Sequence, residues 1–104
     1  MALVNLENTV WDCSDLDDGD RNIIVFNNDH TFHYISVISS SGNQGVCWMK
    51  ESDTWSVEGN KVILSFTDGY MIREAFLNES EDYMSGKLRN VKGLTGTWSA
   101  RKIN

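Results

Sequence analysis

The chain is short of basic residues and has no long apolar run. Nine Lys and Arg residues stand against 15 Asp and Glu, so the formal net charge is -6. Proteins that bind nucleic acids or anionic membranes need clustered positive charge, and the basic residues here are scattered. No stretch is long and apolar enough to cross a bilayer as a helix. The composition therefore predicts no nucleic-acid partner and no membrane association.

The chain also has few residues of the kinds that catalysis and metal binding use. Its two cysteines, Cys13 and Cys47, lack metal-site spacing and are more typical of two buried thiols than of a disulfide bridge. The two histidines, His30 and His33, would leave a turn and a strand in different directions, which disfavours a shared metal ion. Nothing local activates either thiol, and no glycine-rich phosphate loop is present. We therefore expect no enzyme, no metal site and no cofactor.

Size and composition limit the fold. With 104 residues the chain has room for a single domain, residues 1–104, around one hydrophobic core. Hydrophobic residues at 40% and charged residues at 23% are typical of a soluble globular domain. Four tryptophans favour strands, because aromatic rings fit pleated surfaces. Residues 1–7 contain no basic region and no apolar stretch of secretory length, so we expect a cytoplasmic protein, or a secreted one if the chain is a trimmed mature form.

Runs of β-branched and aromatic residues recur along the chain, separated by turn residues and without a single proline. The clearest hairpin spans residues 54–66 around Gly59-Asn60, since both of these residues accept the positive φ angles of tight turns. Further strands are expected at residues 9–13, 22–27, 31–39, 46–50, 70–78, 83–91 and 94–103. About eight short antiparallel strands at this spacing predict an all-β, up-and-down barrel. A short helical turn at residues 3–8 is expected to plug one end.

Period-two alternation assigns most side chains to the inside or the outside of the barrel. The expected inward set is Trp11, Ile24, Phe26, Phe32, Tyr34, Ser36, Ile38, Trp55, Val57, Val62, Leu64, Phe66, Trp98 and Ala100. Residues 70–78 leave two alternatives open: either Glu74 or Arg73 points inward, and that charge then needs a partner or water. Gly86 leaves room for a bulky neighbour, for which Trp98 is the candidate. Trp48 is either an exposed binding anchor beside the loop 39–45 or a packed ring.

Several short motifs follow one another in an order that resembles a known architecture. They are Trp11, the segment 26–34 with the turn Asn28-Asp29-His30, the hairpin 55–60, Met84-Ser85-Gly86 and the segment 96–100. Together they resemble the small bacterial lipocalin-like, or calycin-type, barrel domains. Where such domains usually have a glycine after Asn-Asp, this chain has His30. The resemblance implies an antiparallel barrel that holds a small apolar ligand, and it implies no catalytic residue.

The first functional hypothesis is a non-enzymatic binding module. A cavity lined by aromatic side chains would take up a small hydrophobic molecule. The expected ligand-binding residues are Phe32, Tyr34, Trp55, Tyr70, Glu74 and Trp98. The competing interpretation is that these rings simply fill the core of a short chain.

The second hypothesis is an acidic interaction module that binds and inhibits or regulates a basic protein partner, as small acidic inhibitors of phages and mobile elements do. Complementary charge would make the association fast and salt-sensitive. The expected partner-binding residues are Asp15, Asp17, Asp18, Asp20, Glu79, Glu81 and Asp82. The first four do not form an EF-hand, because Gly19 and Phe26 fall at two of its ligand positions.

An apolar strip is expected on the outside of the barrel. If the ring-bearing face of residues 31–39 points inward, Ile23, Val25 and Ile35 adjoin one another on the outer surface. A contiguous strip of this kind predicts a partner or a dimer seam, unless the amino-terminal turn covers it. We therefore expect a monomer or a homodimer.

Overall fold

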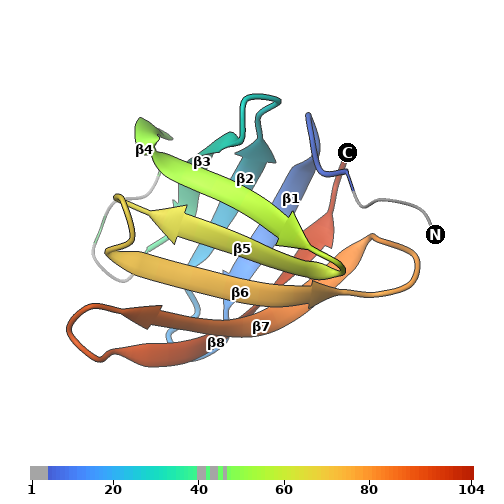
Figure 1. The fold of residues 1–104 in the computed structure, drawn as a ribbon. Coiled ribbons are helices and arrows are strands. Elements are labelled where there is room, and N and C mark those ends of the chain that lie inside the picture. The colour runs from blue at the N-terminus through green and yellow to red at the C-terminus, as the bar shows by residue number, and fades with distance from the viewer. Residues whose placement is uncertain (1–4, 40–41, 43–44, 46) are drawn as a thin grey trace.

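The chain folds into a closed barrel of antiparallel strands (Figure 1). The computed structural model describes residues 5–39, 42, 45 and 47–104, without the side chains of residues 48–50. The strands are β1 (Val10–Asp15), β2 (Arg21–Phe26), β3 (Thr31–Ile38), β4 (Cys47–Glu58), β5 (Lys61–Phe66), β6 (Met71–Leu77), β7 (Tyr83–Asn90) and β8 (Thr95–Lys102). Each strand pairs with the next, and β8 pairs with β1. The expected all-β, up-and-down barrel of eight strands is confirmed.

The hairpin of β4 and β5 forms where the sequence predicts it. Trp55 pairs with Leu64 across the two strands, and Val57 pairs with Val62. These side chains lie in the core or pack against it. Gly59 in the turn has a φ of 64°, in the left-handed region that glycine adopts freely. Alternating apolar residues and a glycine turn therefore fix both the register and the inward face.

Strand β6 resolves the alternative that its sequence left open. Arg73, Ala75 and Leu77 point inward and are buried. Glu74 lies on the outer face, where its Oε1 accepts a hydrogen bond from Nη1 of Arg89 at 3.0 Å. The small and apolar side chains of Ala75 and Leu77 fit the core, so the charge that they bring inside is that of Arg73.

Gly86 of β7 is required by the backbone of the neighbouring strand. It pairs with Trp98 of β8, as expected. A Cβ at Gly86 would lie 2.7 Å from Cα of Ala75, however, and would overlap the carbonyl oxygen of Glu74. The space that Gly86 leaves therefore serves β6 rather than the indole of Trp98.

The connections between strands divide the barrel into two ends (Figure 1). The turns β2–β3, β4–β5 and β6–β7 lie at one end, which we call the plugged end, together with the carboxyl terminus and the first described residues of the chain. The connections 16–20, 67–70 and 91–94 belong to the other end, which we call the open end. Among the described residues no helix is long and apolar enough to span a membrane.

At the plugged end the amino-terminal segment covers the core. Leu6 is only 2% exposed, and the amide of Asn8 donates to the carbonyl of Phe26 at 2.7 Å. The segment makes one turn, in which the amide of Thr9 donates to the carbonyl of Leu6 at 3.1 Å. Residues 3 and 4 of the expected helical turn lie outside the described residues. The plug is therefore a single turn that inserts one leucine.

Large rings fill the barrel beneath this plug. Trp11 packs edge-on against Phe26 with ring centroids 6.4 Å apart, and Phe26 packs edge-on against Trp55 at 5.6 Å. All three are buried, as are Phe32 and Met84 beside them. We call this part of the interior the plugged half: Leu6, Trp11, Ile24, Phe26, Phe32, Trp55, Val62, Ala75, Leu77, Met84 and Ala100.

His30, which stands where related turns usually have glycine, adopts a glycine-like conformation. Its φ is 68°, and its ring stacks on Trp55 with centroids 4.6 Å apart and planes 29° from parallel. The backbone amide of Trp55 donates to the carbonyl of His30 at 2.8 Å, and its indole nitrogen donates to the carbonyl of Asn27 at 3.0 Å. The turn and the β4 indole are therefore held together by three contacts.

Two predictions for the outer surface and strand ends have different outcomes. Ile23 pairs with Ile35 on the outer face, where Ile35 is 38% exposed and Ile23 and Val25 are half-buried. The inward placement of Ile38 is wrong, because the pairing of β2 with β3 shifts next to Asn22 and leaves Ile38 half exposed. The side chain of Trp48 and most of the loop 39–45 lie outside the described residues.

Candidate functional site

The half of the barrel nearer the open end contains buried polar groups, which the plugged half lacks among its described members. We call it the polar half, and its members are Cys13, Asp15, Asn22, Tyr34, Asp53, Leu64, Phe66, Arg73, Leu88 and Trp98. Alternation of polar and apolar residues along β1, β3, β4 and β6 brings these side chains to the inner face.

Arg73 lies between two aromatic rings. Its Cζ atom is 5.3 Å from the ring centroid of Phe66 and 5.4 Å from that of Trp98, within the range of cation–π attraction. Its Nη2 atom is 3.9 Å from Oδ2 of Asp15, and its Nε atom is buried without a hydrogen-bond partner. Burial lowers the pKa of Arg73, against the opposing effect of Cys13, Asp15 and Tyr34. The guanidinium is thus held by rings and one distant carboxylate.

Asp15 provides that carboxylate from the end of β1. Its side chain is 15% exposed, and burial raises its pKa while the charge of Arg73 lowers it. The backbone amide of Asp15 donates to the carbonyl of Asp20 at 2.7 Å and closes the β1–β2 loop. Asp15 therefore faces the interior and is less available to an external partner than its position in an acidic loop suggests.

Asp53 is the second buried carboxylate of the polar half. It is 1% exposed, its Oδ1 accepts from the amide of Thr67 at 2.8 Å, and its Oδ2 has no partner. The surrounding part of β4 forms a bulge against β3. The register shifts there: Thr31 pairs with Thr54, whereas His33 pairs with Met49. The bulge and the β5–β6 turn meet at Asp53.

Tyr34 lies on the same inner face, beside Phe66. The two rings are 5.5 Å apart, and Tyr34 is only partly buried. Burial raises the pKa of its hydroxyl, the charge of Asp53 raises it further, and Arg73 opposes both. Tyr34 is therefore within electrostatic reach of both buried charges.

Asn22 and Cys13 complete the polar half from β2 and β1. They are register partners, so their side chains share one face of the sheet. Oδ1 of Asn22 is buried without a hydrogen-bond partner. Burial raises the pKa of the Cys13 thiol to about 12, which keeps it protonated and unreactive near neutral pH. Both cysteines are free thiols, as expected. Cys13 is buried, whereas Cys47 is exposed and its expected burial is wrong.

Exposed apolar side chains surround the open end. They come from three described connections and from the end of β3: Leu16, Ile38, Tyr70, Val91 and Leu94. The amide of Val91 donates to the carbonyl of Tyr70 at 3.0 Å, which ties two of these connections together. The described turns of the plugged end, residues 27–30, 59–60 and 78–82, carry mostly polar and charged residues.

The predicted ligand-binding residues do not all meet. Phe32, Tyr34, Trp55 and Trp98 lie inside the barrel, but Phe32 and Trp55 belong to the plugged half. The inward placement of Tyr70 and Glu74 is wrong. Tyr70 lies in the β5–β6 turn and is 43% exposed, and Glu74 is on the outer face, where Arg89 lowers its pKa by a hydrogen bond. Of the two alternatives for residues 70–78, the structure has the one with Arg73 inside, and Tyr70 precedes β6.

Sequence reasoning missed Asp53 and Asn22. The sequence predicts a strand that ends at residue 50 and another that begins at residue 54, whereas β4 is continuous and includes Asp53. Asp53 and Trp55 are two residues apart, and in a continuous strand this spacing places both side chains on one face. That spacing is the sequence feature that indicates an inward Asp53.

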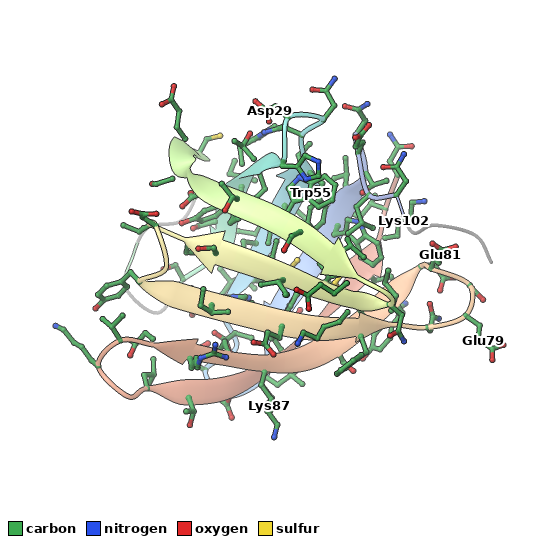
Figure 2. All side chains as sticks on the ribbon, in the orientation of Figure 1. Asp29, Trp55, Glu79, Glu81, Lys87 and Lys102 are labelled. Atoms are coloured by element: carbon green, nitrogen blue, oxygen red, sulfur yellow. The ribbon has the colours of Figure 1, made fainter. Side chains whose placement is uncertain are left out.

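The predicted partner-binding acids lie at opposite ends. Asp15, Asp17, Asp18 and Asp20 are at the open end, whereas Glu79, Glu81 and Asp82 are on the β6–β7 turn, where Figure 2 shows Glu79 and Glu81 projecting outward. Oδ2 of Asp17 accepts from the amide of Thr97 at 2.7 Å, and Oδ1 of Asp18 from the amide of Asp20 at 2.9 Å. The acids therefore do not form a single docking surface.

An outer groove of about 510 Å³ lies over β7 and β8, lined by Asp17, Glu74, Lys87, Leu88, Arg89, Thr95, Gly96 and Thr97. Its carboxylates are engaged: Asp17 with the amide of Thr97, and Glu74 with Arg89 and Lys61. Among the described residues, no three His, Cys, Asp or Glu side chains are grouped to hold a metal ion.

Comparisons with protein-family models, with curated proteins and with solved structures each gave no match. The closed antiparallel barrel agrees with the architecture that the calycin-type resemblance implies. The lipocalin-like family and a bacterial source stay predictions.

Proposed function

We propose that this barrel is a non-enzymatic binding module that takes a small amphipathic molecule into its polar half through the open end. The observation that carries the proposal is a set of buried polar atoms without partners: Oδ1 of Asn22, Oδ2 of Asp53 and Nε of Arg73. A buried polar atom without a hydrogen bond costs free energy, which a ligand that pairs with it recovers.

The location of this site differs from the one that the aromatic residues suggested. In the plugged half the rings of Trp11, Phe26 and Trp55 pack against one another and are at most 5% exposed. In the polar half Tyr34 is only partly buried, and the same end of the barrel carries the exposed apolar side chains of the open end, which we call the rim. The rim and Tyr34 suit the apolar body of a ligand, and the unpaired atoms suit its polar group.

Tryptophan fluorescence tests this proposal, because Trp98 lies against Arg73. We expect apolar dyes and small amphiphiles to change the emission and to saturate at one equivalent. Tyr34→Ala removes the ring that we place against the body of the ligand, and it should weaken binding at least about tenfold, a loss of about 1.4 kcal/mol. Phe76→Ala is the matched control, because it removes a ring that is 58% exposed on the outer face of β6, and it should bind as the parent does. Unsaturable binding, or equal binding by both variants, contradicts the proposal.

The second candidate function is that of an acidic module that binds a basic protein. It is favoured by the exposed position of Glu79 on the β6–β7 turn, away from the open end (Figure 2). We propose that this turn, with Glu81 and Asp82, docks on a basic protein in a salt-sensitive manner.

Pull-down at low and high salt tests it with two charge-removal variants. Glu79→Gln/Glu81→Gln/Asp82→Asn removes the turn carboxylates, and Asp18→Asn/Asp20→Asn/Asp68→Asn removes an equal charge from the open end. Loss of a salt-sensitive partner in the first variant alone supports docking by the turn. Retention of all partners in the first variant excludes it.

A further inference from the structure

The unpaired atoms of the polar half specify the chemistry of the ligand, and this inference rests on the proposed function. Among the described residues, two unpaired buried atoms accept hydrogen bonds, Oδ1 of Asn22 and Oδ2 of Asp53, and one donates, Nε of Arg73. A ligand that supplies donors satisfies more of them than one that supplies acceptors. The count therefore favours a donor-rich polar group.

The charges of the polar half favour the same chemistry. Asp15 and Asp53 are two carboxylates against the single guanidinium of Arg73. Arg73 already faces Asp15 and lies over the rings of Phe66 and Trp98. An anionic ligand would have to compete with Asp15 for it, whereas Oδ2 of Asp53 has no competing cation within hydrogen-bond distance.

The loops of the open end extend this negative field to the entrance. The described connections at residues 16–20, 67–70 and 91–94 carry four acids and one base, which are Asp17, Asp18, Asp20, Asp68 and Lys92. A negatively charged entrance attracts cations and repels anions. The exposed apolar side chains of Leu16, Tyr70 and Leu94 lie in the same connections and suit a hydrophobic body.

We infer that the ligand is an amphipathic organic amine. Its ammonium group donates to Oδ2 of Asp53 and to Oδ1 of Asn22, and its apolar body lies against Tyr34 and the rim. A hydrogen-bonded ion pair inside the barrel is stronger than the same pair in water, because the local dielectric constant is lower. Asp53 is then a ligand-binding residue, while Arg73 and Asp15 balance each other's charge.

Three probes with one aromatic body separate the possibilities: 1-naphthylmethylamine, 1-naphthalenemethanol and 1-naphthaleneacetic acid. We expect the amine to bind at least about tenfold more tightly than the alcohol, and the acid to bind most weakly. In Asp53→Asn the amine should fall to within about twofold of the alcohol, and the affinity for the alcohol should not change. The asparagine retains an oxygen for the amide of Thr67, and thermal unfolding checks that the variant folds.

Asp18→Asn is the matched control, because it removes one carboxylate from the same end outside the barrel. It should weaken amine binding by no more than about twofold. Tightest binding of the acid, or an Asp53→Asn variant that still prefers the amine as the parent does, overturns the inference and leaves the binding function intact. If none of the three probes binds saturably, the proposed function fails as well. An unfolded Asp53→Asn variant transfers the test to Asn22→Leu, which should also reduce the preference for the amine.

Discussion

The two halves of one barrel differ in what fills them. In the plugged half, rings and aliphatic side chains contact one another under the amino-terminal turn, and nearly all are at most 5% exposed. In the polar half, Asp53, Asn22 and Arg73 each have a buried polar atom without a hydrogen-bond partner, and Arg73 faces Asp15 at 3.9 Å. Both halves are built by the same strands, so strand pairing does not explain the difference. We therefore expect the plugged half to be the main source of stability, and the polar half is where we propose that the ligand binds.

Truncation of Trp11 should produce the largest loss of stability. Trp11 is completely buried, and its indole nitrogen donates to Oγ1 of Thr9 at 3.0 Å. Trp11→Ala leaves a cavity, so we expect the free energy of unfolding to fall by about 3–5 kcal/mol in urea titrations. Phe76→Ala removes an aromatic ring that is 58% exposed on the outer face of β6, and it should cost less than about 1 kcal/mol. Similar losses in both variants would show that the plugged half is not the main source of stability.

Replacement of the buried ion pair should change the free energy of unfolding less than truncation of Trp11 does. Arg73→Met/Asp15→Asn removes both charges and keeps an apolar side chain over Phe66 and Trp98. Buried ion pairs contribute little net stability after their desolvation, so we expect a change within about 2 kcal/mol in the same urea titrations. A loss as large as that of Trp11→Ala would make the polar half a structural element.

The sequence predicted the plugged half better than the polar half for a physical reason. Apolar alternation and the Gly59 turn identify β4 and β5, because only one face of each strand can be buried. In β6 the neighbours Arg73 and Glu74 are both charged, so alternation alone could not choose the face. The decisive factor is the fit of Ala75 and Leu77 against the core, which depends on other strands.

The β4 bulge is the other feature that the sequence could not supply. It changes the pairing of β4 with β3 between Thr54 and Met49, and it brings Asp53 to the amide of Thr67. A register shift depends on which residues of a distant strand lie opposite, and a local pattern does not record them. The polar residues that we propose for binding are therefore less predictable from the sequence than the rings of the core.

Variants of His30 show how much the left-handed backbone of this turn contributes to stability at the plugged end. His30 has a φ of 68°. Glycine and asparagine tolerate this left-handed conformation, whereas alanine does not, so His30→Gly and His30→Asn should preserve the backbone of the turn better than His30→Ala. We expect His30→Ala to be about 1–2 kcal/mol less stable than His30→Gly, by urea titration, with His30→Asn between them. Equal losses in all three variants would show that the ring stacked on Trp55, rather than the backbone conformation, holds the turn.

The smallest expected effect is an opposite pH dependence of stability at the two ends. Asp29, at the plugged end, has a pKa lowered by hydrogen bonds from the side chain and the amide of Thr31. Its contribution is therefore present above the ordinary carboxyl pKa of about 3.9 and is lost as the pH falls through the folded value. Asp15, in the polar half, has a pKa raised by burial, so the folded chain retains its proton longer than the unfolded chain. Its contribution is present at acid pH and is lost as the pH rises through the folded value.

The melting temperatures of the parent, Asp29→Asn and Asp15→Asn between pH 3 and pH 7 distinguish these contributions. Relative to the parent, Asp29→Asn should become less stable as the pH rises, because only the parent gains from ionisation at this position. Asp15→Asn should become more stable relative to the parent over the same rise, because burial of the ionised carboxylate then costs the parent free energy. Parallel curves for the two variants would mean that Asp15 is solvated as well as Asp29 is. The division of the barrel into a filled half and a half that buries charge would then not hold.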